Sequence, residues 1–115
     1  MNEEIKAKWV AALRSGKYKQ GKSVLHHETP DGSVFCCLGV LCDLAVKAGV
    51  KMAVVRNESN SSYQYNSRLS LLPDAVEAWA GLSTGDPRGG DRRLTDLNDR
   101  GTSFSKIASL IETHL

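Results

Sequence analysis

The chain has 115 residues, of which 41% are hydrophobic, 24% are charged and 6% are aromatic. A chain of this length normally forms one domain and buries about two-thirds of the surface that its unfolded form exposes. The 15 lysines and arginines outnumber the 13 aspartates and glutamates by two, for a net charge of +2. This balance excludes a polycationic nucleic-acid tail and an acidic disordered chain. The few aromatic residues argue against a stacking platform for single-stranded nucleic acid.

The compartment is suggested by the start of the chain and by the cysteines. Residues 1–6 lack the basic and apolar regions of a signal peptide, and the longest apolar run, residues 38–46, is too short to span a bilayer. We therefore expect a cytoplasmic protein with no membrane partner. Thiols in that compartment stay reduced, so we interpret Cys36, Cys37 and Cys42 as small buried hydrophobic residues.

The first predicted element is a helix over residues 3–15. Asn2 is a suitable N-cap, and apolar residues such as Ile5 and Trp9 recur at helical spacing after it. Gly16 can adopt the left-handed conformation that ends many helices. This region therefore has a start signal, a buried face and a stop signal.

The next predicted elements are a polar, basic connector over residues 17–21 and a β-hairpin. Apolar runs at residues 23–27 and 33–37 flank the sequence Pro-Asp-Gly at residues 30–32. Proline presets one backbone angle of a turn and glycine accepts a positive φ, so this sequence indicates a hairpin turn. Residues 38–48 then have the apolar spacing of a helix.

The rest of the chain predicts two further strands and up to three helices. In chain order, these are strands at 52–55 and 63–65, a helix that opens at 71–74 and ends at Gly81, a glycine-rich connector at 85–93, a single helical turn at 94–99 and a helix over 104–115. We see no linker that divides the chain. The predicted fold class is α+β, with a small antiparallel sheet of β-hairpins covered by three to four helices in one domain, residues 1–115.

Soft metal ligands and a possible nucleophile gather around the hairpin. Cys36 and Cys37, if both lie on a strand, point to opposite faces, and the paired spacing of a structural zinc site is absent. We therefore predict no metal, and with no dinucleotide or phosphate-loop fingerprint we predict no cofactor. A thiolate–imidazole pair across the hairpin, using His26 or His27, stays open as an alternative.

Two basic connectors are candidates for anion binding. Lys17, Lys19 and Lys22 follow the first helix, and the first 22 residues carry a net charge of +4. Arginines at 88, 92 and 93 lie among glycines, where guanidinium groups and backbone N–H groups suit phosphate oxygens. The second connector balances its arginines with aspartates, so the first 22 residues are the more attractive region for an anion.

Four sequence blocks together resemble a known group of proteins. They are residues 9–21 (Trp-Val-Ala-Ala-Leu-Arg-Ser-Gly-Lys-Tyr-Lys-Gln-Gly), residues 35–45 with Phe-Cys-Cys-Leu-Gly, Leu72-Pro73 with Trp79 to Leu82, and Leu94 to Asp99 followed by Gly101, Ser103-Phe104 and Ile107-Ala108. In this order they resemble a family of small uncharacterised proteins encoded by tailed bacteriophages and prophages. The likeness covers nearly the whole chain. It implies a phage accessory protein that acts in the cytoplasm of the bacterial host.

Small phage accessory proteins often counter host defence, and this setting ranks the possible functions. A chain this short, with no complete catalytic constellation, is expected to bind rather than to transform its ligand. We predict that it sequesters a phosphorylated small molecule, namely a nucleotide immune signal. Such a pocket needs a stacking ring, basic donors and amides. The predicted ligand-binding residues are Lys17, Tyr18, Lys19, Gln20, Arg92, Arg93 and Asn98, brought together within one chain or across a homo-oligomer interface.

Two other functions stay open at this point. The first is a protein–protein inhibitor of a host defence enzyme, with Trp79 or residues 56–68 as its contact face. The second is an enzyme that degrades a nucleotide signal with His26, His27 and a cysteine. Binding to DNA is disfavoured by a net charge of only +2.

Overall fold

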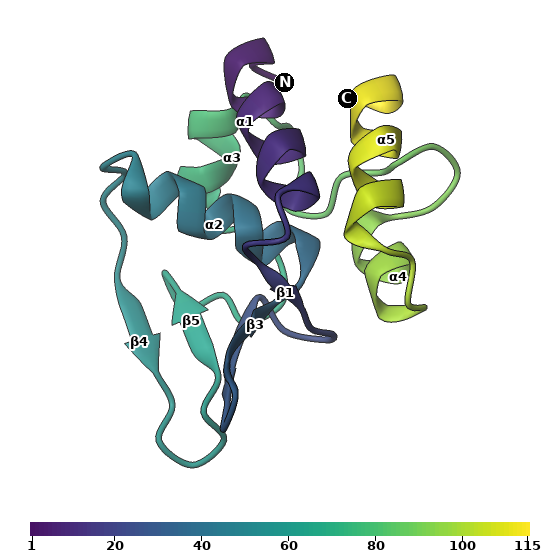
Figure 1. Ribbon diagram of the computed structural model, residues 1–115. Helices are drawn as coiled ribbons and strands as arrows, with labels where there is room; N and C mark the ends of the chain where they lie inside the picture. The colour runs from purple at the N-terminus through teal and green to yellow at the C-terminus, as the bar shows by residue number, and fades with distance from the viewer.

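Helices and strands occupy opposite ends of the molecule, which we describe from a computed structural model of residues 1–115 (Figure 1). The elements in chain order are α1 (Glu3–Arg14), β1 (Lys19–Gln20), β2 (His26–Thr29), β3 (Gly32–Phe35), α2 (Cys37–Lys47), β4 (Val54–Arg56), β5 (Tyr63–Tyr65), α3 (Asp74–Ala80), α4 (Leu94–Asp99) and α5 (Phe104–His114). The fold class is α+β, as predicted. There are five helices rather than three or four, because residues 94–99 form a short helix of their own.

The two terminal helices lie side by side at the helical end of the molecule (Figure 1). The Asn2 side chain caps α1 by accepting a hydrogen bond from the Ile5 backbone N–H at 2.9 Å. Near its other end, Arg14 of α1 forms an ion pair with Glu112 of α5 at 2.8 Å. The predicted helix is therefore confirmed, although it ends one residue earlier than expected.

The hairpin pairs β2 with β3 in antiparallel register, from His26 opposite Phe35 to Thr29 opposite Gly32. The strands are shorter and shifted from the prediction, because the chain leaves the sheet after Phe35. Cys36 becomes the N-cap of α2, and its sulfur accepts a hydrogen bond from the Gly39 N–H at 3.4 Å. The expectation that Cys36 and Cys37 lie on a strand is therefore wrong.

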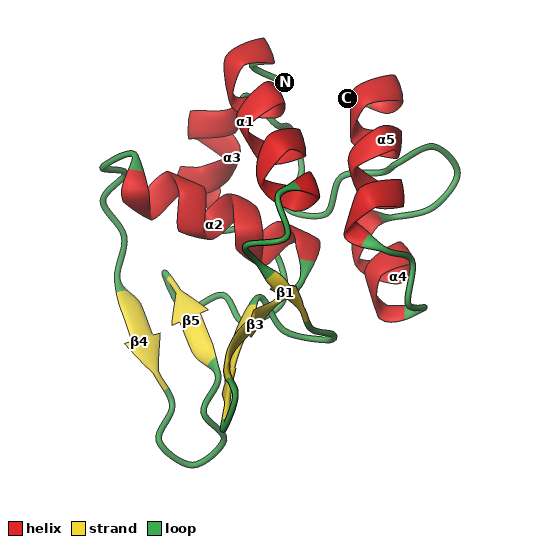
Figure 2. Ribbon diagram, viewed as in Figure 1, coloured by secondary structure: helices red, strands yellow, loops and turns green.

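The connector at residues 17–21 contains a short strand that was not predicted. This strand, β1, pairs with β3 in parallel, with Lys19 opposite Val34 and Gln20 opposite Phe35. The sheet has the strand order β1-β3-β2 and is mixed rather than purely antiparallel (Figure 2). The pairing continues beyond the strand, since the Gly21 N–H donates to the Phe35 carbonyl at 2.7 Å.

The second sheet is the antiparallel pair β4–β5, which borders the hairpin (Figure 2). Its register runs from Val54 opposite Tyr65 to Arg56 opposite Tyr63. All three residues of β4 are exposed to solvent, whereas Tyr65 of β5 is buried. The β4–β5 sheet is therefore anchored to the molecule through β5.

One hydrophobic core joins the helices to both sheets. It contains 22 buried residues, and α2 lies at its centre, with every residue from Cys37 to Cys42 buried. The Trp9 indole N–H donates to the Cys37 carbonyl at 2.9 Å, and a Cβ on Gly39 would come within 1.7 Å of the Leu25 carbonyl oxygen. All three thiols are buried, which confirms their predicted role as core residues. No helix is both long enough and apolar enough to cross a bilayer.

Candidate functional site

A pocket of about 790 Å³ opens between the end of α1, the β2–β3 hairpin and α2. This volume lies in the usual range for small-molecule sites. The pocket is lined by Ala11, Ala12, Ser15, Lys17, Tyr18, His26, Ser33, Phe35, Asp43, Leu44 and Lys47. Aromatic, hydroxyl and charged groups therefore meet in one cavity, which we call the hairpin pocket.

Aromatic rings form one wall of the hairpin pocket. The Tyr18 ring meets the Phe35 ring edge-on, with centroids 5.1 Å apart and an interplanar angle of 84°. The His26 ring stacks between Phe35 at 4.1 Å and Tyr63 at 4.0 Å. Aromatic contacts at these distances are favourable, so the wall holds its shape before any ligand arrives.

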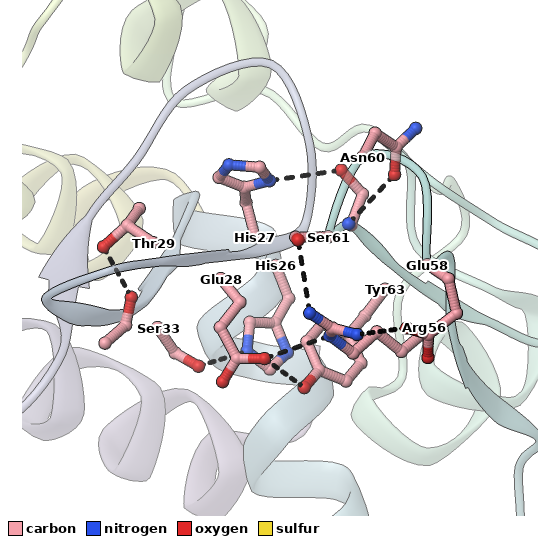
Figure 3. Close-up of polar contacts among 12 residues, drawn as sticks. His26, His27, Glu28, Thr29, Ser33, Arg56, Glu58, Asn60, Ser61 and Tyr63 are labelled. Atoms are coloured by element: carbon pink, nitrogen blue, oxygen red, sulfur yellow. Dashed lines mark hydrogen bonds and ion pairs between the residues drawn. The ribbon is translucent and has the colours of Figure 1, made fainter.

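Both ring nitrogens of His26 are hydrogen-bonded. Nδ1 lies 2.9 Å from the Tyr65 hydroxyl, and Nε2 lies 2.8 Å from the Ser33 hydroxyl, a contact at the hairpin drawn in Figure 3. The buried Tyr65 hydroxyl has no other partner, so it donates to Nδ1, because a buried hydroxyl without an acceptor is costly. Burial lowers the pKa of His26 and favours its neutral form, in which Nε2–H donates to Ser33.

This proton arrangement decides what Ser33 can do. Because the Ser33 oxygen accepts from Nε2–H, His26 is not placed to remove the proton of that hydroxyl. The hydrogen of the Ser33 hydroxyl is left to donate to an acceptor in the hairpin pocket. The geometry therefore suits ligand recognition better than nucleophilic attack by serine.

A small charged cluster surrounds the Tyr18 hydroxyl in the same pocket. The Tyr18 hydroxyl donates to the Asp43 carboxylate, and the Lys47 ammonium lies 2.9 Å from that carboxylate and 3.3 Å from the Tyr18 oxygen. The hydrogen bond to Asp43 raises the pKa of Lys47, and burial raises the pKa of Tyr18. Lys17 is exposed and forms no ion pair, so its charge is available to a ligand.

Two of the predicted ligand-binding residues serve the fold instead. Asn98 is fully buried; its Oδ1 accepts from the Cys37 N–H at 3.1 Å and its Nδ2 donates to the Gly21 carbonyl at 2.7 Å. The Gln20 amide donates to Asn98 Oδ1 at 3.0 Å and to the Thr102 carbonyl at 2.7 Å. These amides join β1, α2 and α4 and do not line the hairpin pocket.

The other predicted residues are distributed over the surface. Of the seven predicted residues, only Lys17 and Tyr18 line the hairpin pocket. Lys19 is exposed on β1, Arg92 pairs with Asp96 at 3.1 Å, and Arg93 lines a different cavity. The structure therefore does not gather the seven predicted residues within one chain.

The rest of the hairpin pocket comes from residues that the sequence analysis did not assign to it. The signal for two of them was present, since Asp43 and Lys47 are four residues apart on a predicted helix and so share a face. His26 and Phe35 were expected on facing strands, but nothing in the sequence fixed their register.

Comparison with known families assigns the chain to a group. All of residues 1–115 match the family described as a domain of unknown function, DUF8296. The chain belongs to the DUF8296 family. Searches of curated proteins and of solved structures return no match.

In this DUF8296 member the thiols do not form the thiolate–imidazole pair that the sequence left open as an alternative. Burial raises the pKa of Cys36 to about 11 and raises those of Cys37 and Cys42 as well. The hydrogen bonds of both hairpin imidazoles go to hydroxyls, that of His27 to Ser62 at 3.3 Å. A buried thiol with a raised pKa is a poor nucleophile. No three potential metal ligands of the DUF8296 chain cluster together.

A second polar cluster connects the hairpin to the β4–β5 sheet. Figure 3 shows the Glu28 carboxylate facing Arg56 and Tyr63. It accepts from Arg56 Nε at 3.1 Å and from the Tyr63 hydroxyl at 3.1 Å, and Arg56 also contacts Glu58 at 3.0 Å. These contacts tie β2 to β4 and β5, and they hold Tyr63 in place against His26.

Proposed function

We propose that this protein binds a small phosphorylated molecule of the nucleotide class in the hairpin pocket and sequesters it without catalysis. The observation that carries the proposal is the meeting of aromatic rings and two lysines in one cavity of about 790 Å³. A nucleotide presents the same combination, namely a flat ring and an anionic phosphate.

The lining groups suit the parts of such a ligand. A base can contact the Tyr18 and Phe35 rings, and ammonium groups attract phosphate oxygens from Lys17 and Lys47. The hydroxyl of Ser33 can donate to a carbonyl or ring nitrogen of the base. Asp43 is already engaged by Tyr18 and Lys47, which limits its repulsion of an anion.

The same groups support binding over turnover. A general base needs a free lone pair directed at the substrate. His26 uses both ring nitrogens within the protein, and Asp43 accepts from two neighbours. The resemblance to phage proteins extends the proposal to its setting, which is counter-defence in the cytoplasm of a bacterial host, with a host immune nucleotide as the ligand.

The test is calorimetric titration with mononucleotides, cyclic dinucleotides and cyclic ADP-ribose species. At least one of them should bind, and Lys17→Ala or Lys47→Ala should raise its dissociation constant about tenfold, because each removes a charged contact. Lys106→Ala is the matched control, since this exposed lysine of α5 lines no pocket.

The fate of the ligand separates sequestration from its alternatives. After binding, the protein is denatured by heat and the molecular mass of the released ligand is measured by mass spectrometry. An unchanged mass supports sequestration, and a changed mass would instead support an enzyme. If no nucleotide in the panel binds, the proposal fails.

The exposed strand β4 favours a second candidate, which is inhibition of a host protein. Val54 and Val55 are 41% and 58% exposed, and they lie next to the polar loop that was predicted as a contact face. Trp79 is half-buried and packs on the core, so it contributes less to such a face than expected. A pull-down from host lysate with wild type and Val55→Lys tests this candidate, since a partner held by β4 should be lost with the variant.

A further inference from the structure

A second pocket, of about 650 Å³, lies where the loop between α3 and α4 meets the end of α5. It shares no lining residue with the hairpin pocket. Its charged and titratable side chains are Asp86, Arg88, Arg93 and His114. The glycine-rich connector of the sequence therefore forms a cavity of its own.

The two arginines of this pocket face each other across the loop. Arg88 and Arg93 are partners in an isolated antiparallel bridge. Like charges directly opposite each other on paired strands are destabilising. Neither arginine forms an ion pair, in contrast to Arg14, Arg56, Arg92 and Arg100, which all contact carboxylates. A bound anion would relieve this repulsion.

The loop is held in position before any ligand binds. The Gly89 N–H donates to the Arg92 carbonyl and the Leu94 N–H donates to the Pro87 carbonyl, both at 2.9 Å. Gly90 adopts a φ of +94°, and a Cβ there would lie 3.2 Å from Nε2 of His114. The His114 ring therefore packs against the loop, and the arginines project from a braced turn.

The remaining charged side chain of the lining, that of Asp86, does not neutralise the arginines. Asp86 accepts from the Thr95 hydroxyl at 2.8 Å and from the Thr95 N–H at 3.4 Å, so it is turned toward the start of α4. Arg88 donates one guanidinium N–H to the Asp91 carbonyl at 2.8 Å. The side chain of Arg93 donates no hydrogen bond within the protein. Most of the guanidinium N–H groups remain free.

We infer that this pocket binds a phosphate group through Arg88 and Arg93, with His114 at its edge. Guanidinium groups bind phosphate oxygens in pairs of parallel hydrogen bonds, and two of them match a dianion. The inference concerns a second site and does not depend on the nucleotide pocket. Free phosphate and a phosphate ester offer the same group, so we name that group alone.

The experiment follows binding of pyrophosphate and of inorganic phosphate by NMR at constant ionic strength. The expected result is a shift of the arginine Nε–Hε signals and of the His114 ring signals on addition of either anion. Arg88→Gln and Arg93→Gln should each raise the dissociation constant about tenfold, because each removes charge-assisted hydrogen bonds. Arg92→Gln is the matched control, since Arg92 has the same charge beside Arg93 but contacts Asp96.

Further variants keep the outcomes distinct. Arg93→Lys retains the positive charge but loses the planar guanidinium group that forms paired hydrogen bonds, so it should bind the anions more weakly than wild type. This variant replaces Arg93→Gln if Arg93→Gln does not fold. In Lys17→Ala, pyrophosphate should shift the Arg88, Arg93 and His114 signals as it does in wild type, which separates this site from the hairpin pocket. The inference is overturned if neither anion shifts these signals, or if Arg92→Gln weakens binding as much as Arg93→Gln, which would show diffuse attraction only.

Discussion

The helical half and the sheet half of the molecule are held together by different forces. In the helical half, Trp9, Leu38 and Ile107 are completely buried in a continuous apolar core. In the sheet half, β4 is exposed along its length, and contacts between the sheets include the polar groups of Glu28 and Arg56. Apolar burial is insensitive to pH and moderate salt, whereas polar contacts respond to both. The hairpin pocket lies on the boundary between these halves.

This difference predicts how the two walls of the hairpin pocket respond to change. The wall from α1 and α2 should persist as long as the protein is folded. The wall from the hairpin should loosen first when acid, salt or mutation weakens its polar contacts, since regions with few buried apolar contacts open at lower free energy. Three experiments test whether the two halves of the molecule differ in this way.

The largest effect is expected from Asn98→Ala in the helical half. The substitution leaves the Cys37 N–H and the Gly21 carbonyl without their partner in a buried site. We expect a loss of about 3 kcal/mol in the free energy of unfolding, measured by urea denaturation, because each unsatisfied buried group costs about 1–3 kcal/mol. The control is Asn60→Ala in an exposed loop, with an expected loss of about 0.5 kcal/mol. Similar losses for both variants would contradict the contrast between the halves.

A smaller effect is expected from acid acting on His26. Burial lowers the pKa of this residue below its ordinary value of 6.5 in the folded protein. When the pH falls below about 6.5, the unfolded chain takes up a proton that the folded chain does not, so the stability contributed by neutral His26 is present above that pH and lost progressively below it. The urea midpoint should therefore fall between about pH 7.5 and about pH 5.5.

Two measurements assign this acid effect to His26. An NMR titration of the His26 ring should give an apparent pKa below 6.5. His26→Phe retains a ring to stack on Phe35 and Tyr63 and should show a flatter dependence of the urea midpoint on pH, although its stability is lower throughout because Tyr65 loses its acceptor. A His26 pKa at or above 6.5 would count against this explanation.

The smallest effect is expected from Glu28→Gln, which removes the ion pair with Arg56. Both side chains are partly exposed, so we expect a loss of about 0.5 kcal/mol that shrinks as salt is added. Glu58→Gln is the control, because its side chain is 87% exposed and its contact with Arg56 should contribute almost nothing. A loss that does not change with salt would show that Glu28 acts through packing instead.

The elements that the sequence predicted well carry their signals locally. The helix α1 has its cap at Asn2 and its apolar spacing within 12 residues, so neighbouring side chains define it. Strand β1 has no such signal, because Lys19 and Gln20 become a strand only through pairing with β3. Cys36 misled the prediction because an apolar run that suits a strand ended in an uncommon helix cap.

The candidate site was predictable only in part, for a related reason. Tyr18 beside Lys17 was recognisable as a ring next to a cation, and both residues line the hairpin pocket. Gln20 and Asn98 carry amides that suit a ligand equally well as a buried backbone group, and only the fold decides between these uses. Arg93 was identified as an anion-binding residue, but its placement in a separate pocket depends on the path of the loop.

The buried thiols of the core can report how often the helical half of the molecule opens. A thiol-modifying reagent acts on the thiolate of an accessible cysteine, and burial keeps the completely buried Cys37 and Cys42 protonated and out of reach. Modification must then wait for the helical half to open, so its rate without denaturant reports how often that opening occurs. Backbone amide exchange in β4 follows the sheet half in the same sample, which gives each half of the molecule a separate time scale.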